Sequence, residues 1–260
     1  MSGLALDLEQ TLETSIRAAE RILLFLDFDG TLSPIVARPE LAALDERSRK
    51  ALEALLRFPR VAVAVVSGRA LDDLRSRVGL PVIYAGNHGL EIQGPDFAFR
   101  TPGLEKALAA FDVIESGLAG SLRHIPGVLI EHKGLAVSVH FRLAAPAQKP
   151  EVERIVEEAC RGHLDAVRLR AGKEIVEIRP AVDWDKGTAA RWIRDRLGAR
   201  GWPIVCAGDD LTDEDMFVAL PDAVSIKVGA GPTMARFRVA DTGGLSALLE
   251  RVAAAMPRAR

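Results

Sequence analysis

Two aspartates separated by one residue, Asp27 and Asp29, lie at the end of an apolar segment. Carboxylates at this spacing at a strand end can point toward one site, where one attacks an electrophile and the other transfers a proton. Gly30, the next residue, allows the chain to turn sharply there. A solvated Asp-Gly turn has the same sequence, so this pair alone leaves both interpretations open.

A second acidic segment, GDDLTDEDMF at residues 208–217, follows another apolar run. If its Asp209, Asp210 and Asp213 lie near the first pair, charges about 4 Å apart repel by roughly 4 kcal/mol per pair at an effective dielectric of about 20. Such a cluster requires a cation. Its donors are all oxygens, without clustered His or Cys, which favours Mg²⁺ over zinc. The alternative for Asp213 and the acids after it is a helix N-terminus with Thr212 as its N-cap.

Two further segments suit a phosphate group. Ser67-Gly68-Arg69 ends an apolar run and precedes a helical pattern, so its hydroxyl and backbone N–H groups can bind phosphoryl oxygens. Lys186 begins another helical pattern, and its ammonium group can neutralise charge that develops on a phosphoryl group. Alone, each has an ordinary alternative, because Ser-Gly before a helix is commonly a cap and a lone Lys is usually solvated.

Apolar, β-rich segments alternate with helical patterns along much of the chain. The expected strands are residues 22–28, 61–66, 82–85, 204–207 and 223–228, and the expected helices are 45–57, 71–78, 186–197 and 212–220. Strands that are apolar on both faces predict a mostly parallel sheet with helices on both sides. Ligands bind beyond the C-terminal strand ends of such sheets. Those ends carry Asp27, Ser67, Asn87 and Asp209, which we therefore expect at one edge.

The middle of the chain follows a different pattern. A helical stretch at 104–118 precedes two alternating runs joined by Lys133-Gly134, which is a hairpin signal. A helix at 151–160 and a second hairpin around 171–173 complete an αββαββ order. We therefore predict an α/β core from residues 1–103 and 181–260, with an inserted α+β domain at 104–180. Hinges are expected near Thr101–Gly103 and Arg179–Val182.

Composition restricts the classes of partner. The chain has 260 residues, 48% of them hydrophobic, and a formal net charge of −2, so we expect no nucleic-acid partner. Its apolar runs are too short to span a bilayer, its N-terminal segment at 6–20 resembles an amphipathic helix rather than a leader, and we expect no membrane partner. The two cysteines, Cys160 and Cys206, have no CxxC spacing, so they suggest neither a disulfide framework nor a thiolate zinc site. We expect a cytoplasmic monomer.

The order of these motifs resembles that of the haloacid dehalogenase (HAD) superfamily. The resemblance implies a Rossmann-like core with an inserted cap domain, and it implies that Asp27 is the nucleophile and forms an aspartyl-phosphate. Asp29 would then be the general acid and base, and Ser67 and Lys186 would hold the phosphate.

The same resemblance implies a bound Mg²⁺. Its ligands would be Asp27, the backbone carbonyl of Asp29, and Asp209. Either Asp210 or Asp213 would support it.

Over nearly its whole length the chain is similar to the trehalose-6-phosphate phosphatase family. The segments that carry this similarity are LDFDGTL, VSGR, GNHG, EHKGLAVSVHFR, EIRP, the Lys186-Gly187 pair and GDDLTDEDMF. It implies hydrolysis of a small sugar phosphate, trehalose 6-phosphate, to trehalose and phosphate. The residues implied in substrate binding are Arg69, Asn87, His88, Glu131, Lys133, Arg142 and Glu177.

Other interpretations of the sequence stay open. Arg142 and His140 alternate with apolar residues and also fit the solvated face of a sheet. A phosphatase for sucrose phosphate or a glycosyl phosphoglycerate has similar requirements. A non-catalytic sugar-phosphate-binding regulator is the alternative from another class, although binding alone needs no nucleophile.

Overall fold

The computed structural model describes residues 8, 10–12, 14, 19–36, 38–172 and 174–256. The chain forms two compact units: a core unit, Met1–Arg100 with Trp184–Arg260, and a cap unit, Thr101–Asp183. These limits lie three residues outside the predicted insertion limits of 104 and 180. Most of the helix expected at residues 6–20 falls outside the described residues.

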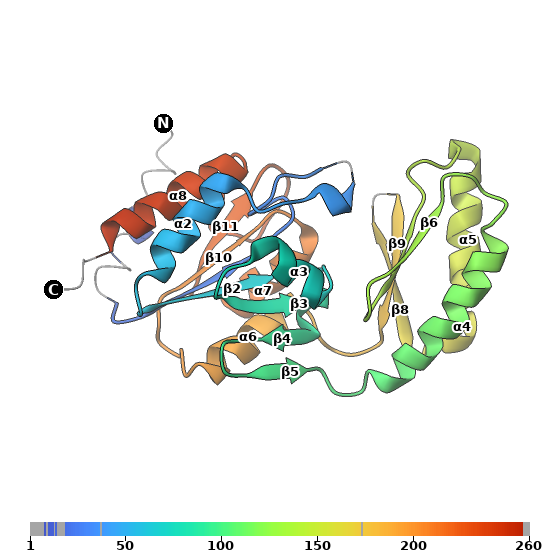
Figure 1. Ribbon diagram of the computed structural model, residues 1–260, viewed down its shortest axis with the longest axis horizontal. Helices are drawn as coiled ribbons and strands as arrows, with labels where there is room; N and C mark the ends of the chain where they lie inside the picture. Colours follow the sequence, from blue (N-terminus) through green and yellow to red (C-terminus); the bar gives the residue numbers. More distant parts are fainter. Residues whose placement is uncertain are drawn as a thin grey trace. The chain divides into compact units, whose positions relative to one another are not determined.

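The core unit contains an eight-stranded sheet in the order β12-β11-β10-β1-β2-β3-β4-β5 (Figure 1). Its strands are β1 (Ile22–Leu26), β2 (Val61–Val66), β3 (Ile83–Gly86), β4 (Glu91–Gln93), β5 (Ala98–Arg100), β10 (Ile204–Gly208), β11 (Val224–Val228) and β12 (Phe237–Val239). Pairing is parallel from β12 to β3, and β4 and β5 add an antiparallel hairpin at the edge. The predicted parallel sheet is confirmed.

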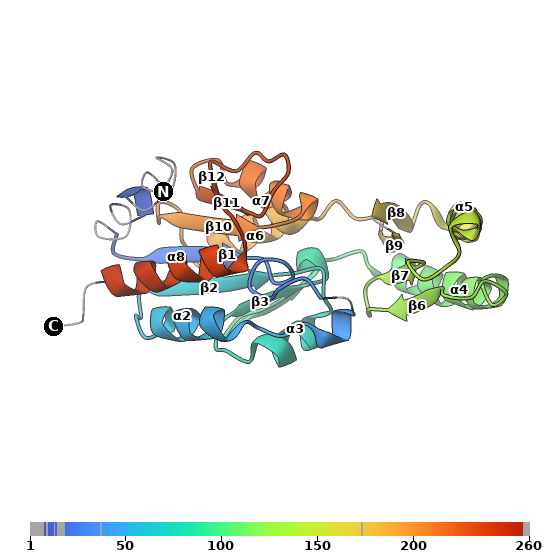
Figure 2. The same ribbon diagram turned by 90° about the horizontal axis from the view of Figure 1, so that it is seen from above.

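Helices cover both faces of this sheet (Figure 2). One face carries α2 (Glu46–Leu56), α3 (Leu71–Val78) and α8 (Thr242–Ala255), and the other carries α6 (Lys186–Arg196) and α7 (Glu214–Ala219). Strand β1 supplies Leu24 and Leu26 to the first hydrophobic cluster, and Leu23 and Phe25 to the second. Because successive side chains alternate between faces, an apolar central strand has both faces buried.

The cap unit is an antiparallel sheet in the order β6-β7-β9-β8, with two long helices. The elements are α4 (Glu105–Ser121), β6 (Leu129–His132), β7 (Val137–His140), α5 (Lys149–Cys160), β8 (Val167–Gly172) and β9 (Ile175–Pro180). Apolar residues of α4 and α5 pack with those of the strands in one cluster. The helices therefore cover one face of the cap sheet, as the αββαββ pattern predicts.

Short 3₁₀ helices occur at Pro39–Leu41 (η1), Asn87–Gly89 (η2), Pro146–Gln148 (η3), Arg161–His163 (η4) and Leu211–Asp213 (η5). None of the described helices has the length and apolar character needed to cross a membrane.

One predicted hinge overlaps the cap sheet. Arg179 and Pro180 belong to β9 and pair with β8, and the Ala181 N–H donates to the Ala166 carbonyl at 2.8 Å. Sheet hydrogen bonds thus hold the first residues of the predicted hinge segment, and the hinge near Arg179–Val182 stays a prediction. Only the residues after Ala181 are outside that ladder.

Candidate active site

Four polar residues directly follow the C-terminal ends of neighbouring parallel strands. Asp27 follows β1, Ser67 follows β2, Asn87 follows β3 and Asp209 follows β10. The backbone continues the sheet pairing at two of them, since the Asp27 N–H donates to Ala207 and the Ser67 N–H donates to Ala85. The prediction that these residues share one edge of the sheet is confirmed.

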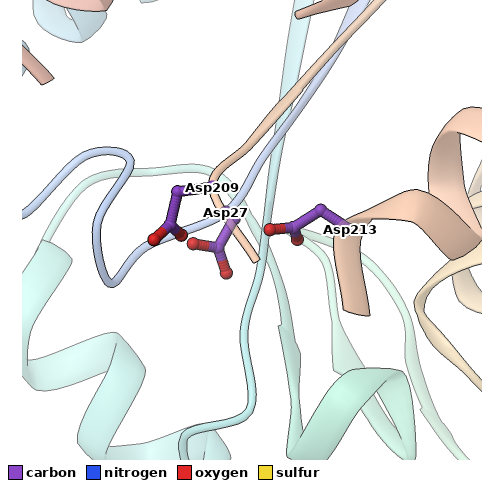
Figure 3. Close-up of side chains that lie close together, drawn as sticks. All are labelled: Asp27, Asp209 and Asp213. Carbon is purple, nitrogen blue, oxygen red and sulfur yellow. The ribbon is translucent and has the colours of Figure 1, made fainter. Parts of the chain in front are cut away.

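Three carboxylates converge at this edge. Oxygen atoms of Asp27, Asp209 and Asp213 all lie within 4.8 Å of one another, and Figure 3 shows the three side chains facing a common point. Asp27 is 4% exposed and Asp213 is fully buried. Gly30 permits this approach: it has φ +84°, and a Cβ there would lie 2.1 Å from Asp209 Oδ2.

Lys186, the first residue of α6, joins two of these carboxylates. Its Nζ donates to Asp27 Oδ1 at 2.6 Å and to Asp213 Oδ1 at 2.7 Å, and the residue is 2% exposed. Burial alone would lower the pKa of Lys186, but Asp213 and Asp27 outweigh burial and raise it, so the ammonium stays charged. Three ionised carboxylates and one ammonium leave two formal negative charges in the cluster.

Burial disfavours the ionised form of these carboxylates unless a cation balances their charge. It raises the pKa of Asp27 well above its ordinary value, and Asp213 adds to the effect. It also raises the pKa of Asp209 to about 6, again with a contribution from Asp213. A buried set of oxygen donors with two uncompensated negative charges fits Mg²⁺ in ligand type and in charge. Lys227 lies outside the set, donating to the backbone carbonyl of Asp209 at 2.5 Å.

The structure separates the two candidates for metal support. Asp213 lies in the cluster, whereas Asp210 is exposed and its Oδ1 accepts the Leu211 N–H at 2.6 Å. Asp210 and Asp213 also form a capping box at the start of η5. The alternative with Thr212 as the N-cap is wrong, because Asp210 is the N-cap of η5 and Asp213 is that of α7.

Asp29 is not one of the three carboxylates that converge among the described residues. Its two oxygens accept hydrogen bonds from Arg69 Nε and Nη2, both at 2.7 Å. The Ser67 hydroxyl lies on the same loop as Arg69 and accepts its backbone N–H at 3.2 Å. Helix α3 begins only at Leu71, so Ser67 is not its cap. The role of Arg69 as a substrate ligand stays a prediction.

A left-handed turn at η2 makes backbone hydrogen bonds to the loop that contains Ser67 and Arg69. Asn87, His88 and Gly89 all have positive φ, at 50°, 57° and 89°. The Asn87 N–H donates to the Arg69 carbonyl at 2.7 Å, and the His88 N–H donates to the Ser67 carbonyl at 2.8 Å. Non-glycine residues adopt this conformation only at some cost in free energy, so the surrounding contacts must enforce it.

The cap unit carries its own polar cluster on the face of its sheet opposite the helices. Lys133 Nζ lies 3.6 Å from both Glu131 and Glu177, which the strand register places on β6 and β9. His140 bonds Glu131 at 2.9 Å, and Arg179 Nε bonds Glu177 at 2.9 Å. A hydrogen bond from His140 lowers the pKa of Glu131.

Sequence reasoning missed His140 and Arg179 as members of this cluster. Their alternation with apolar neighbours was the available signal, because it placed them on the same face as Glu131 and Glu177. Arg142 lies apart from these residues and pairs instead with Glu174 at 3.4 Å.

Comparison with known proteins agrees with this geometry. A family model described as trehalose-phosphatase matches residues 25–242. The trehalose-phosphate phosphatase of Mycobacterium marinum is 43% identical over 216 residues, which are 80% of this chain and 54% of that protein. The chain thus spans about half the length of this relative.

Solved structures extend the comparison to the fold. A protein described as trehalose-6-phosphate phosphatase related superposes with a TM-score of 0.79 at 32% identity, covering 89% of this chain and 97% of the other. A haloacid dehalogenase-like hydrolase from Bacteroides thetaiotaomicron covers 90% of this chain and 100% of its own, with a TM-score of 0.65 at 13% identity. The core unit therefore has the HAD fold, and the chain belongs to the trehalose-phosphatase family.

Proposed function

We propose that this protein hydrolyses trehalose 6-phosphate to trehalose and phosphate through an aspartyl-phosphate on Asp27. The observation that carries the proposal is the buried Asp27 carboxylate, held by Lys186 inside a cluster of three acids. A binding protein would have no use for a nucleophile held in this way. The names of the family and of the mycobacterial relative support the choice of sugar.

In the first step, a carboxylate oxygen of Asp27 attacks phosphorus, and the bond from phosphorus to the sugar oxygen breaks. Asp29 gives its proton to that sugar oxygen, so the leaving group departs as a neutral alcohol. Lys186 and the Ser67 hydroxyl hold the phosphoryl oxygens, where negative charge develops. Lys186 suits this role because its raised pKa keeps it cationic.

In the second step, Asp29 accepts a proton from a water molecule whose oxygen attacks phosphorus. The bond from phosphorus to Asp27 breaks, which releases phosphate, frees the Asp27 carboxylate and leaves Asp29 protonated for the next cycle. Asp27 and Asp209, the backbone carbonyl of Asp29, and Asp213 would hold a Mg²⁺ here, with Asp213 in place of Asp210 because only Asp213 lies in the cluster. When bound, the ion supplies positive charge that stabilises the phosphoryl oxygens.

We assign the sugar to the polar cluster of the cap unit, with Glu131, Lys133 and Glu177 as ligands for hydroxyl groups. Charged groups that are already held by one another present fixed donors and acceptors. Asn87 and His88, beside the Ser67 loop, stay predicted substrate contacts, as does Arg142. The cytoplasm and the monomeric state also stay predictions from the sequence.

The test is phosphate release from a panel of sugar phosphates in the presence of Mg²⁺. The panel contains trehalose 6-phosphate, sucrose phosphate, a glycosyl phosphoglycerate and glucose 6-phosphate, each assayed with wild type and Asp27→Asn. We expect a preference for trehalose 6-phosphate and loss of turnover in the variant, with wild-type rates in Asp45→Asn, since Asp45 only caps α2 and Asn is an equivalent cap. An undiminished rate in Asp27→Asn, or no release from any sugar phosphate, contradicts the proposal.

A further inference from the structure

Arg69 has almost all of its hydrogen-bond donors occupied by protein atoms. Its Nε donates to Asp29 Oδ2 at 2.7 Å, and Nη2 donates to Asp29 Oδ1 at 2.7 Å and to the Pro39 carbonyl at 2.9 Å. Nη1 donates to Asp73 Oδ2 at 2.8 Å. A guanidinium has five N–H groups, so these contacts leave it one. The side chain is 11% exposed, which leaves little of it for a substrate.

The Arg69 guanidinium is also held by residues other than Asp29. Asp73, on α3, accepts from Arg69 and from Arg77 Nε at 2.8 Å, and Arg77 in turn reaches the Ala42 carbonyl. The Arg69 guanidinium lies over the Phe28 ring, 5.5 Å from its centroid. The position of Arg69 is therefore set by α3, by the chain around Ala42 and by the residue between Asp27 and Asp29.

The Asp29 side chain is far more exposed than that of Arg69. It is 43% exposed, and the bidentate contact from Arg69 is what fixes the plane of its carboxylate. Each oxygen accepts one guanidinium N–H and keeps a further lone pair. The proton transfer assigned to Asp29 can therefore use a lone pair that Arg69 does not occupy.

We propose that Arg69 is a positioning residue that holds the Asp29 carboxylate in the direction required for proton transfer. In this proposal Arg69 acts through Asp29, which replaces the direct substrate contact predicted from the sequence. This inference rests on the proposed function, since it assigns a second residue to the proton-transfer step of that reaction.

The test compares two esters that differ in their need for a proton. A sugar alkoxide is a poor leaving group and needs the acid, whereas the nitrophenolate of p-nitrophenyl phosphate leaves without one. In Arg69→Gln we expect kcat for trehalose 6-phosphate to fall by about 10²-fold or more, the range of general acid catalysis, with a KM within about threefold of wild type. Formation of the phosphoenzyme from p-nitrophenyl phosphate, read as the rate of the nitrophenolate burst, should change by less than about threefold.

Two further variants sharpen this comparison. Arg69→Lys keeps the positive charge but loses the two-pronged contact, so it should recover little of the lost kcat. Asp73→Asn loosens the support of Arg69 and should give a smaller loss, again confined to the sugar ester. Arg47→Gln is the matched control, because Arg47 holds Glu250 by the same bidentate contact between α2 and α8. Thermal unfolding of each variant reports whether it is folded.

Three results would overturn the inference. Equal losses for both esters in folded Arg69→Gln would mean a general structural role, and a KM increase alone would mean that Arg69 binds substrate. Full recovery of kcat in Arg69→Lys would mean that charge suffices. These results leave the proposed function intact, whereas a wild type that hydrolyses neither ester overturns that function and the inference with it.

Discussion

At the scale of single residues, the charges at the strand ends determine what the site can bind. Lys186 offsets one of three carboxylates, and Lys227 is directed to a backbone carbonyl. Burial raises the pKa of Asp27 and of Asp209, and the neighbouring carboxylate of Asp213 raises both further. Protonation and metal binding are therefore competing ways to neutralise the same oxygens.

This competition predicts how Mg²⁺ stabilisation depends on pH. The pKa of Asp209 is about 6 in the folded protein without metal and has its ordinary value of 3.8 when unfolded, so the folded state binds this proton more tightly. The free energy of unfolding contributed by this group therefore falls as pH rises between these values. Mg²⁺ should stabilise the protein more at about pH 7.5 than at about pH 4.5.

Urea unfolding with Mg²⁺ or with EDTA at the two pH values measures this difference. Asp209→Asn removes the titrating group and should reduce the pH dependence of the Mg²⁺ effect. Equal stabilisation by Mg²⁺ at both pH values would contradict the interpretation of the cluster as a cation site.

At the scale of elements, the strands of the cap unit bring together residues that are far apart in the chain. Residues Glu131 and Glu177 both lie opposite Ser138 of β7, so they share one face of the sheet. Burial alone would raise the pKa of Glu177, but Arg179 and Lys133 lower it on balance. The carboxylate therefore stays ionised and able to accept hydrogen bonds from hydroxyl groups.

We expect Glu177→Gln to weaken binding of the sugar without affecting phosphate chemistry. The neutral amide is a weaker acceptor than a carboxylate, and a lost hydrogen bond to a charged group costs about 1.5–3 kcal/mol, so KM for trehalose 6-phosphate should rise by about 10- to 100-fold. Steady-state kinetics with trehalose 6-phosphate and p-nitrophenyl phosphate measure this. Glu157→Gln, on an exposed part of α5, is the control. A loss in kcat for both esters would argue against a role in sugar binding.

The sequence predicts elements well where burial alone determines them. The residues of β1 and β2 are apolar on both faces, and only a covered sheet accommodates them. It does not predict β4, β5, β12 or α8. The three strands have three residues each, and the first turn of α8 contains Gly243 and Gly244, which are poor helix formers. Packing against α2 stabilises that helix, including a buried hydrogen bond between Ser48 and Ser246.

The sequence likewise predicts only part of the candidate site. Strand ends and acidic spacing predict that Asp27 and Asp209 meet, because sheet topology alone brings them together. The direction of the Asp29 carboxylate depends on Arg69, which is 40 residues away in sequence, and on the contacts that fix it. Such side-chain orientations follow from tertiary packing, which local sequence does not encode.

At the scale of the whole molecule, the core and cap units have separate hydrophobic cores. The buried cluster of α4, α5 and the cap strands draws all its members from residues 107–178. The apolar clusters of the core unit contain none of these residues. Each unit can therefore bury its apolar surface without the other.

We accordingly expect a fragment of residues 101–183 to fold alone. It should give a cooperative thermal transition and dispersed amide signals in NMR spectra, because its sheet and both helices close on one core. Phe111→Ala, at a fully buried position of α4, should abolish or strongly weaken that transition, since such truncations cost about 3–5 kcal/mol. A disordered wild-type fragment would contradict the independence of the cap unit.

The central position of β1 has a consequence for synthesis on the ribosome. This strand pairs with β2 on one side and with β10 on the other, and Lys186 lies 159 residues after Asp27. Chains emerge from the ribosome N-terminus first. The apolar edge of β1 that pairs with β10 therefore stays unpaired until the whole cap unit has emerged. The nascent core therefore has neither a complete sheet nor a complete set of site residues until Lys186 and β10 have also emerged. The cap unit, whose hydrophobic cluster draws only on residues 107–178, can fold during that interval.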